Sequence, residues 1–576
     1  MPKPYLTSRG TDARLIVDGE PFLIRGGELG NSSGERAYLN NYWPVLESLN
    51  LNTLLVPVYW DAIEPVEGQF EWRIVDELLE DARAHNMRLV LLWFGSWKNS
   101  MSSYAPAWVK TDSERFPRAR SAQGVAMEIL SPFYQANQDA DAKAFAALMA
   151  HLREVDPQHT VIMVQVENEI GMIPGARDHS EAANQAWAAD VPEELLDYLY
   201  AHRDELGTSL QAQLADFDAH TEGPWADVFG DTPATEEIFQ AWAFAKYVEA
   251  VTKAGKAELD LPMFTNAALI RTGTQPGQYP SAGPLPHVAD IWRAGAPSLD
   301  FIAPDIYFPN YAEWADAYVT SGNPLFVPEA LRSVDAAANA LYSFGKHGAM
   351  GFCPFGIESI SGNAARMLAG ANDVVAQLAP YIAAADADRA PQGQSRRAAA
   401  IPAAPPVETK GVRIQVTHPT MTGFLPPTDD QRAPHRIRVG DYDVEATYER
   451  VPAPTLADGV INESGQAAGT EKLPAAAIVI NTGENEYLVG GIGVTLTFHD
   501  PGRGYADGQV ARAGQTPAAS QRDIIGIISA AEGRFDETGE WQQIRWLNGD
   551  QTHQGRHIRL EPGRFAIQKV KLYRYR

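Results

Sequence analysis

The chain of 576 residues is longer than one ordinary domain, and its content of 45% hydrophobic and 21% charged residues is typical of a globular protein. Its 73 acidic against 47 basic residues give a formal net charge of −26, which disfavours nucleic acid and anionic membranes as partners. A single cysteine excludes an intrachain disulfide, and the scattered histidines form no metal-binding motif, so we expect no metal and no cofactor.

No apolar run approaches the ~20 residues that a membrane helix requires. The opening "MPKPYLTSRGTDARLIVDG" contains no signal-peptide hydrophobic region. As it stands the sequence predicts a cytoplasmic protein, whereas a signal peptide removed before this start would indicate a periplasmic or secreted one, so the compartment stays open.

Between about residues 14 and 380, short apolar runs alternate with helical patterns such as 73–86, 142–155 and 238–259. Eight apolar strands separated by helices predict an α/β fold in which a parallel sheet closes into a (β/α)8 TIM barrel. An open doubly wound sheet is the alternative, but its glycine-rich nucleotide turn is missing after the first strand. The strand-like runs are 22–28, 52–60, 88–97, 160–169, 262–269, 300–307, 324–330 and 349–356.

Composition then predicts the domain boundaries. The barrel domain covers 1–385, with a helical insertion at about 172–237 that we expect to cap one barrel face. A linker rich in Ala, Pro and Arg follows at 386–408. Residues 409–576 alternate with period two between glycine turns, which predicts an antiparallel β-sandwich-like domain. We expect an accessory structural role for this domain and leave open a homo-oligomer.

Two strand ends carry candidate catalytic residues, because the active site of such a barrel lies at the carboxyl ends of its strands. The stretch "IMVQVENEIG" (162–171) ends in Glu167, Asn168 and Glu169, and "LFVPEALRS" places Glu329 at the end of the seventh strand. Strand alternation puts Asn168 on the face opposite the two glutamates, unless the strand end bulges. A single strand running out into solvent would look similar. Two carboxylates, one protonated and one ionised, are the minimum apparatus for cleaving a glycosidic bond.

The motif "VQVENEIG" resembles the acid/base signature of clan A glycoside hydrolases, in which Asn precedes the catalytic Glu. The segment from "LIRGGELGNSSGERAYLNN" to "YWDAIEPVEGQFEW" is similar to the first two βα units of family 35, the β-galactosidases, as are "PAW" (106–108) and "PDIY" (304–307). The resemblance covers about 14–380 and is greatest to the variant with "WFGSWKNSMSSYAPAWVK" and an added C-terminal β domain. It implies an exo-acting, retaining hydrolase that removes terminal β-galactose from oligo- or polysaccharides.

Carried over residue by residue, the resemblance implies that Glu169 is the acid/base and Glu329 the nucleophile. Asn168 would bind the sugar 2-hydroxyl, and Tyr307 would bind the nucleophile carboxylate. The two carboxyl groups should then lie ~5–5.5 Å apart. Glu167 is expected to hold the loop through backbone hydrogen bonds.

Two departures from the family pattern affect the sugar subsite. Ser96 in "GSWKN" stands where many members carry a galactose-binding Glu, so we expect Trp97, Lys98 and Asn99 to contact the sugar instead. The stretch "FCPFGIES" replaces the family's "HGGTNFG" and offers Glu358 as a polar ligand. Burial of Trp97, a surface salt bridge for Lys98 and a supporting role for Glu28 remain alternatives. A β-glucosidase, an α-L-arabinofuranosidase or a non-catalytic carbohydrate-binding protein are the alternative functions.

Overall fold

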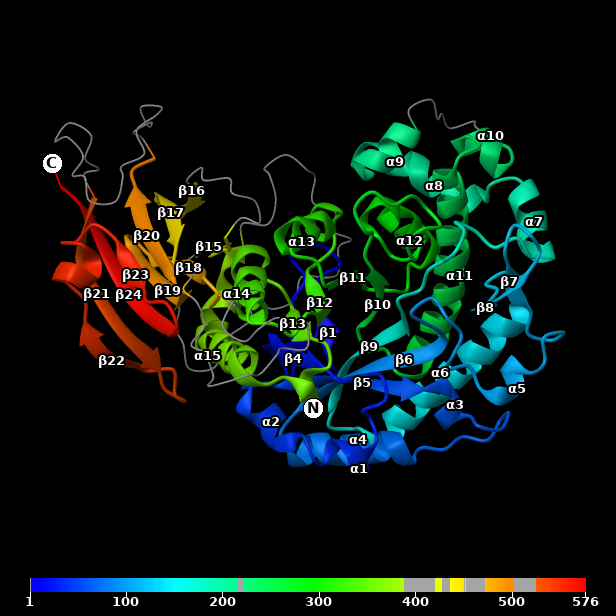
Figure 1. The fold of residues 1–576 in the computed structure, drawn as a ribbon, viewed down its shortest axis with the longest axis horizontal. Coiled ribbons are helices and arrows are strands. Elements are labelled where there is room, and N and C mark those ends of the chain that lie inside the picture. Colours follow the sequence, from blue (N-terminus) through cyan, green and yellow to red (C-terminus); the bar gives the residue numbers. More distant parts are fainter. Residues whose placement is uncertain are drawn as a thin grey trace.

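Eight parallel strands close into a barrel in the computed structural model, which describes residues 2–214, 222–387, 420–426, 436–449, 451, 472–501 and 525–575 (Figure 1). Each strand pairs with its neighbour in chain order, and the last strand pairs with the first through Gly351 and Ile24. All eight predicted strands are therefore present, and closure excludes the open sheet. The strands are β4 (Ile24–Glu28), β5 (Thr53–Tyr59), β6 (Arg88–Lys98), β9 (Val161–Asn168), β10 (Met263–Ala268), β11 (Phe301–Ile306), β12 (Phe326–Ala330) and β13 (Gly351–Pro354).

The helices around the barrel bury apolar side chains, and α11 (Pro233–Glu258) and α14 (Asp335–His347) are buried on almost every side. In α4 (Arg73–Ala84) the buried residues recur at the spacing of one helix face. The three predicted helical stretches are confirmed, although α6 (Gln135–Val155) begins at Gln135 rather than at 142. The other large helices are α12 (Ala289–Gly295), α13 (Tyr311–Thr320) and α15 (Gly362–Ala384), and the shorter ones are α1 (Arg36–Leu39), α2 (Trp43–Ser48), α3 (Trp60–Ile63) and α5 (Ala107–Lys110).

Large apolar side chains fill the barrel interior, so the barrel is a packed core and not a pore. Phe264 stacks on Phe301 with ring centroids 5.1 Å apart, and Phe326 meets Phe264 edge to face. Short strands near the N-terminus add Leu6, Leu15 and Val17 to the same cluster. This apolar filling forms the floor beneath the polar strand ends. These short strands are β1 (Tyr5–Leu6), β2 (Leu15–Val17) and β3 (Glu20–Pro21).

The long connection after β9 is helical, as expected, and packs against α11, α12 and the 3-10 helix η2 (Pro286–Val288). Residues 215–221 of this connection lie outside the described part, and its role as a cap stays a prediction. No helix in the described ranges is long and apolar enough to cross a membrane. The connection contains α7 (Glu181–Ala188), α8 (Glu193–Ala201), η1 (Arg203–Glu205), α9 (Thr208–Gln213) and α10 (Trp225–Phe229), and a hairpin of β7 (Arg118–Arg120) and β8 (Ala126–Leu130) precedes α6.

The C-terminal region forms two packed sheets, as the period-two pattern predicted. Within the described residues of these two sheets, one pair of strands at an edge of the larger sheet is parallel, and the other neighbouring strands run antiparallel. The larger sheet contains β14 (Asp386–Ala387), β15 (Thr420–Phe424), β18 (Ala476–Gly483), β19 (Glu486–Ile492), β24 (Ala566–Arg574), β21 (Ile525–Phe535) and β22 (Trp541–Trp546). The smaller sheet contains β16 (Arg436–Val439), β17 (Tyr442–Tyr448), β20 (Val494–His499) and β23 (Ile558–Leu560).

The central strands of the larger sheet, β18 and β19, are largely buried on both faces, because the second face of the sheet packs on α14 and α15 beside the barrel (Figure 1). A Cβ atom added to Gly345 of α14 would lie 2.8 Å from Gly423 Cα, so the helix and β15 approach backbone to backbone. Most of the predicted linker, 388–408, lies outside the described residues, and the domain boundaries stay predictions.

Candidate active site

The end of β9 breaks the regular alternation of a strand. Glu167 and Glu169 both have positive φ, 62° and 45°, in a backbone region that non-glycine residues seldom occupy. Asn168 and Glu169 therefore face the same site, whereas the Glu167 carboxylate accepts the Trp97 backbone NH. The Asn168 Nδ2 atom lies 3.3 Å from Glu329 Oε1, at the carboxyl end of β12. The alternation that we expected for Asn168 is wrong, and the bulged alternative describes the strand end.

Glu169 is almost completely buried at the barrel mouth. Its backbone NH donates to Asn266 Oδ1 (2.9 Å), and its Oε2 atom accepts a 2.5 Å hydrogen bond from Asn99 Nδ2. Burial and the nearby Glu329 carboxylate raise the pKa of Glu169 to about 7, whereas Lys98 and the hydrogen bond from Asn99 oppose this rise. Below that pH the side chain holds a proton.

Glu329 has hydrogen-bond donors on both of its oxygens. The Tyr307 hydroxyl donates to Oε2 at 2.6 Å, and the amide groups of Asn168 and Asn266 lie 3.3 and 3.5 Å from Oε1. The contact that the resemblance implied for Tyr307 is thus present. These three side chains therefore hold the Glu329 carboxyl group in a fixed orientation.

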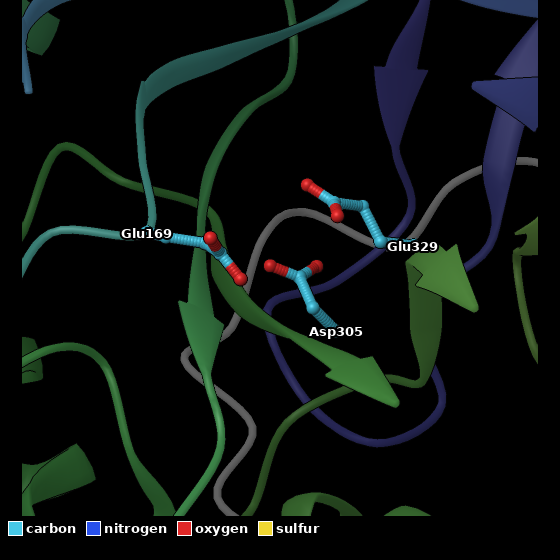
Figure 2. A group of neighbouring side chains, drawn as sticks. All are labelled: Glu169, Asp305 and Glu329. Carbon is cyan, nitrogen blue, oxygen red and sulfur yellow. The ribbon is translucent and has the colours of Figure 1, made fainter. Parts of the chain in front are cut away.

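Asp305 brings a third carboxyl group to the site, and the sequence patterns did not single it out. It pairs with Glu329 across the parallel strands β11 and β12. One carboxylate oxygen from each of Glu169, Asp305 and Glu329 lies within 4.8 Å of the other two (Figure 2). Such a spacing would fit a divalent cation, but clusters of acids also occur without one, and a lysine beside these carboxyls already supplies a positive charge.

That lysine is Lys98, which is only 4% exposed and donates a 2.7 Å hydrogen bond from Nζ to Asn168 Oδ1. Burial lowers its pKa, but the carboxylates of Glu329 and Glu169 raise it by more, so Lys98 stays charged. The alternative of a surface salt bridge is wrong for this buried side chain. Glu28, at the end of β4, is fully buried in the same cluster, and burial and Glu329 raise its pKa well above the usual value.

The segment of β6 before Lys98 bulges away from β9, because the pairing between these strands shifts between Trp93 and Lys98. Glu167 Oε2 accepts the Trp97 backbone NH at 2.7 Å, which is the loop-holding contact expected for Glu167. The Trp97 indole is completely buried against Phe244 and Tyr247 of α11. Trp97 therefore presents no surface to a sugar, and the alternative of burial describes it.

Ser96 and Glu358 also have structural partners. The Ser96 hydroxyl lies 2.7 Å from the Tyr247 hydroxyl, under the bulge and away from the carboxyls. Glu358, in the 3-10 helix η3 (Ile357–Ser359), accepts hydrogen bonds from Ser33 Oγ at 2.6 Å and from Gly30 N at 3.1 Å. Glu358 thus fixes the loop after β4, and no direct contact joins it to Glu169 or Glu329.

Sequence reasoning missed Asp305 and Asn266, and it placed Glu28 only as a supporting residue. All three residues lie toward the carboxyl ends of barrel strands. An isolated polar residue at such a position looks the same in sequence as a strand that simply runs out into solvent. The available signal was their position, since each follows an apolar run that enters the same barrel mouth.

Two family models match the chain. Residues 39–249 match the family 42 glycoside hydrolase model, described as β-galactosidase, and residues 368–559 match a domain of unknown function (DUF5597). A β-galactosidase of Xanthomonas manihotis is 28% identical over 188 residues, which are 31% of this chain and 28% of that protein. The expected resemblance to family 35 is therefore corrected to family 42.

Several solved β-galactosidases are similar to this chain. The enzyme of Bacillus circulans sp. alkalophilus has 15% identity and a TM-score of 0.43, over 63% of this chain and 57% of that one. The cold-adapted enzyme of Rahnella sp. R3 has 17% identity and a TM-score of 0.44, over 66% and 58%. A catalytic mutant of the family 42 enzyme Gan42B from G. stearothermophilus has 15% identity and a TM-score of 0.46, over 67% and 59%.

The chain spans little more than a quarter of the curated relative and less than two thirds of each of these solved chains. Residues 39–249 of its barrel region match the family 42 β-galactosidase model, and most of its C-terminal region matches a domain without an assigned function.

Proposed function

We propose that the protein is a retaining exo-β-galactosidase in which Glu169 is the acid/base and Glu329 the nucleophile. The observation that carries the proposal is the approach of their carboxylate oxygens to within 4.8 Å at the barrel mouth. Retaining glycosidases hold the two carboxyl groups ~5–5.5 Å apart, whereas inverting enzymes leave ~6.5–9.5 Å for a water molecule. The match of residues 39–249 to the family 42 β-galactosidase model supports the choice of sugar.

The surroundings of the two glutamates support a division of roles. Burial and a neighbouring negative charge raise the pKa of Glu169, so it holds a proton for the leaving group. Glu329 accepts hydrogen bonds from Tyr307 and Asn168, which hold its carboxyl group in place for nucleophilic attack. A site with one protonated and one ionised carboxyl meets the requirement of glycoside cleavage.

In the first step, Glu329 attacks the anomeric carbon while Glu169 gives its proton to the departing oxygen. The bond to the leaving group breaks and an ester bond to Glu329 forms. In the second step, Glu169 takes a proton from water, and the water oxygen displaces Glu329 from the sugar. The Asn168 amide lies beside Glu329 at 3.3 Å, which supports its proposed role of binding the sugar 2-hydroxyl in both steps.

A second candidate is a clan A glycosidase for another sugar, and one specific observation favours it. The Ser96 side chain bonds to Tyr247 under the β6 bulge, and the buried Trp97 offers no surface to a sugar. The sugar contacts of this subsite must then come from other polar groups, such as Lys98 and Asn99. A β-glucosidase or an α-L-arabinofuranosidase would satisfy the same two-carboxylate chemistry.

Hydrolysis of a panel of aryl glycosides distinguishes the candidates. The panel contains a β-galactoside, a β-glucoside, an α-L-arabinofuranoside, a β-xyloside and a β-fucoside. The proposal predicts the highest kcat/KM on the β-galactoside. Preference for another sugar would select the second candidate, and sugar binding without any cleavage would contradict both and leave a carbohydrate-binding protein.

A further inference from the structure

The barrel mouth contains more carboxyl groups than the proposed reaction uses. Four carboxyls and one lysine gather there, each from the end of a different strand, and all are at most 6% exposed. Glycoside cleavage requires only two carboxyls. The mechanism therefore leaves two carboxyls of this cluster without a role. The five side chains are Glu28, Lys98, Glu169, Asp305 and Glu329.

The charge balance of the cluster requires protons on most of its carboxyls. Four carboxylates beside one lysine would be left largely uncompensated in a buried volume, where like charges repel strongly. Glu329 accepts hydrogen bonds on both oxygens, and the proposed reaction needs it as the ionised nucleophile. The protons then belong on the other three.

Asp305 is linked to Glu169 through the side chain of Asn266. Its Oδ2 atom accepts a 2.7 Å hydrogen bond from Asn266 Nδ2, and the Oδ1 atom of the same Asn266 accepts the Glu169 backbone NH at 2.9 Å. One amide thus ties the two acidic residues together. The Oδ1 atom of Asp305 is buried and has no hydrogen-bond partner within the described residues. In Figure 2 the Asp305 carboxyl points toward the carboxyl of Glu169.

We propose that Asp305 is a positioning residue that keeps its proton throughout turnover and donates a hydrogen bond to Glu169 whenever Glu169 is ionised. The proposal rests on the function assigned above. When the ester forms, Glu329 loses its negative charge, and Glu169 becomes negative because its proton leaves on the departing oxygen. The cluster therefore keeps one carboxylate beside Lys98 both in the free enzyme, where it is Glu329, and in the ester intermediate, where it is Glu169. The Asp305 proton stays on Asp305 and stabilises the new carboxylate.

The electrostatic surroundings of Asp305 agree with this arrangement. Burial, followed by the negative charges of Glu329 and Glu169, raises the pKa of Asp305 well above its usual value. The nearby Asp305 carboxyl is among the influences that lower the pKa of Glu169. The titratable groups that influence Asp305, or that it influences, from the surrounding elements are Glu28, Lys98, Glu169, Tyr307, Tyr318 and Glu329.

The sign of a pKa shift in the pH profile of kcat/KM tests the proposal. In the wild type, Glu169 should set an alkaline limb near pH 7. Asp305→Ala removes a donor to the Glu169 carboxylate, so the limb should move to higher pH by on the order of half a unit or more. Asp305→Asn keeps an NH donor and should leave the limb near its wild-type position.

A limb that moves to lower pH in either variant would overturn the proposal, because it would mean that Asp305 is ionised and repels the Glu169 charge. An unmoved limb in Asp305→Ala would overturn it as well. Asp300→Asn, just before the amino end of β11, is the matched control and should not move the limb.

Infrared difference spectra supply a readout that needs no activity. Subtracting the Asp305→Asn spectrum from the wild-type spectrum at about pH 8, above the pKa of Glu169, should leave a protonated carboxyl band. A carboxylate band in its place would overturn the proposal. This test does not need Asp305→Ala, so it remains decisive when that variant fails to fold. A wild type that cleaves no glycoside would instead contradict the proposed function, with the infrared result still valid.

Discussion

Lys98 Nζ donates a 2.7 Å hydrogen bond to Asn168 Oδ1, and this contact joins β6 to the end of β9 at the centre of the proposed site. Because the amide oxygen is bound to the lysine, the amide NH2 is turned toward Glu329 Oε1, 3.3 Å away. Lys98 therefore sets the orientation of the group that we expect to bind the sugar 2-hydroxyl, in addition to supplying positive charge.

Replacing Lys98 with Met keeps most of the side-chain volume but removes this charge. We expect kcat/KM to fall by roughly 10²-fold or more, the size of a lost preorganised charge contact. Lys98 lowers the pKa of Glu169, so the alkaline limb of the pH profile should also move up. Lys110→Met on α5 is the matched control, and wild-type kinetics in Lys98→Met would contradict a role for the charge.

Replacing Glu169 with Ala should affect substrates according to their leaving groups. A nitrophenolate needs little protonation as it departs, whereas a sugar hydroxyl needs it strongly, so the loss should reach roughly 10²–10⁴-fold only for the poor leaving group. Kinetics on a nitrophenyl galactoside and a galactosyl disaccharide measure the difference. Equal losses on both substrates would count against the acid role.

Glu329→Gln should abolish turnover, with a loss of roughly 10³-fold or more, while sugar binding measured by calorimetry is retained. The amide keeps the volume of the carboxyl but cannot attack the anomeric carbon. Glu329→Gly with added azide should yield a glycosyl azide of inverted configuration. Unchanged turnover in Glu329→Gln would remove the nucleophile assignment.

Glu28→Gln should stabilise the protein at neutral pH. The folded protein raises the pKa of this carboxyl above the ordinary value of 4.5. Over the range from that value up to the raised pKa, the folded state binds more protons than the unfolded state, so stability falls as pH rises. The gain in Tm for Glu28→Gln should therefore be larger at pH 8 than at pH 4. A larger gain at pH 4 would mean that Glu28 is ionised in the fold.

The contact between the barrel and the C-terminal sheet should be sensitive to a single methyl group. A Cβ atom at Gly423 would lie 2.7 Å from the Lys346 backbone nitrogen, so Gly423→Ala should destabilise the protein by about 1–3 kcal/mol. Gly207→Ala is the control, because its nearest neighbours would be 3.8 Å away. Equal Tm values for both variants would show that α14 and β15 can move apart enough to accommodate the methyl group at little cost in stability.

The barrel and its two central glutamates were predictable because parallel strands buried on both faces appear as continuous apolar runs. A glutamate that ends such a run stands out, as Glu169 and Glu329 do. The orientation of Asn168 was not predictable, since it depends on positive φ at its two neighbours. The burial of Trp97 depends on a bulge that Glu167 and Asp141 hold in place through the backbone of β6.

Asp305 was missed for a different reason. Its significance comes from contacts with Asn266 and with carboxyls far away in the sequence, and no local pattern encodes them. A single acidic residue in "PDIY" resembles the ordinary end of a strand.

If Glu169 and Glu329 act as proposed, they cleave a β-galactoside with retention of configuration. This outcome is measured by following the hydrolysis of an aryl β-galactoside by proton NMR and identifying the anomer released first. We expect β-galactose, which then mutarotates to the equilibrium mixture. Release of α-galactose first would indicate an inverting mechanism and would rule out the proposed role of Glu329 as a nucleophile.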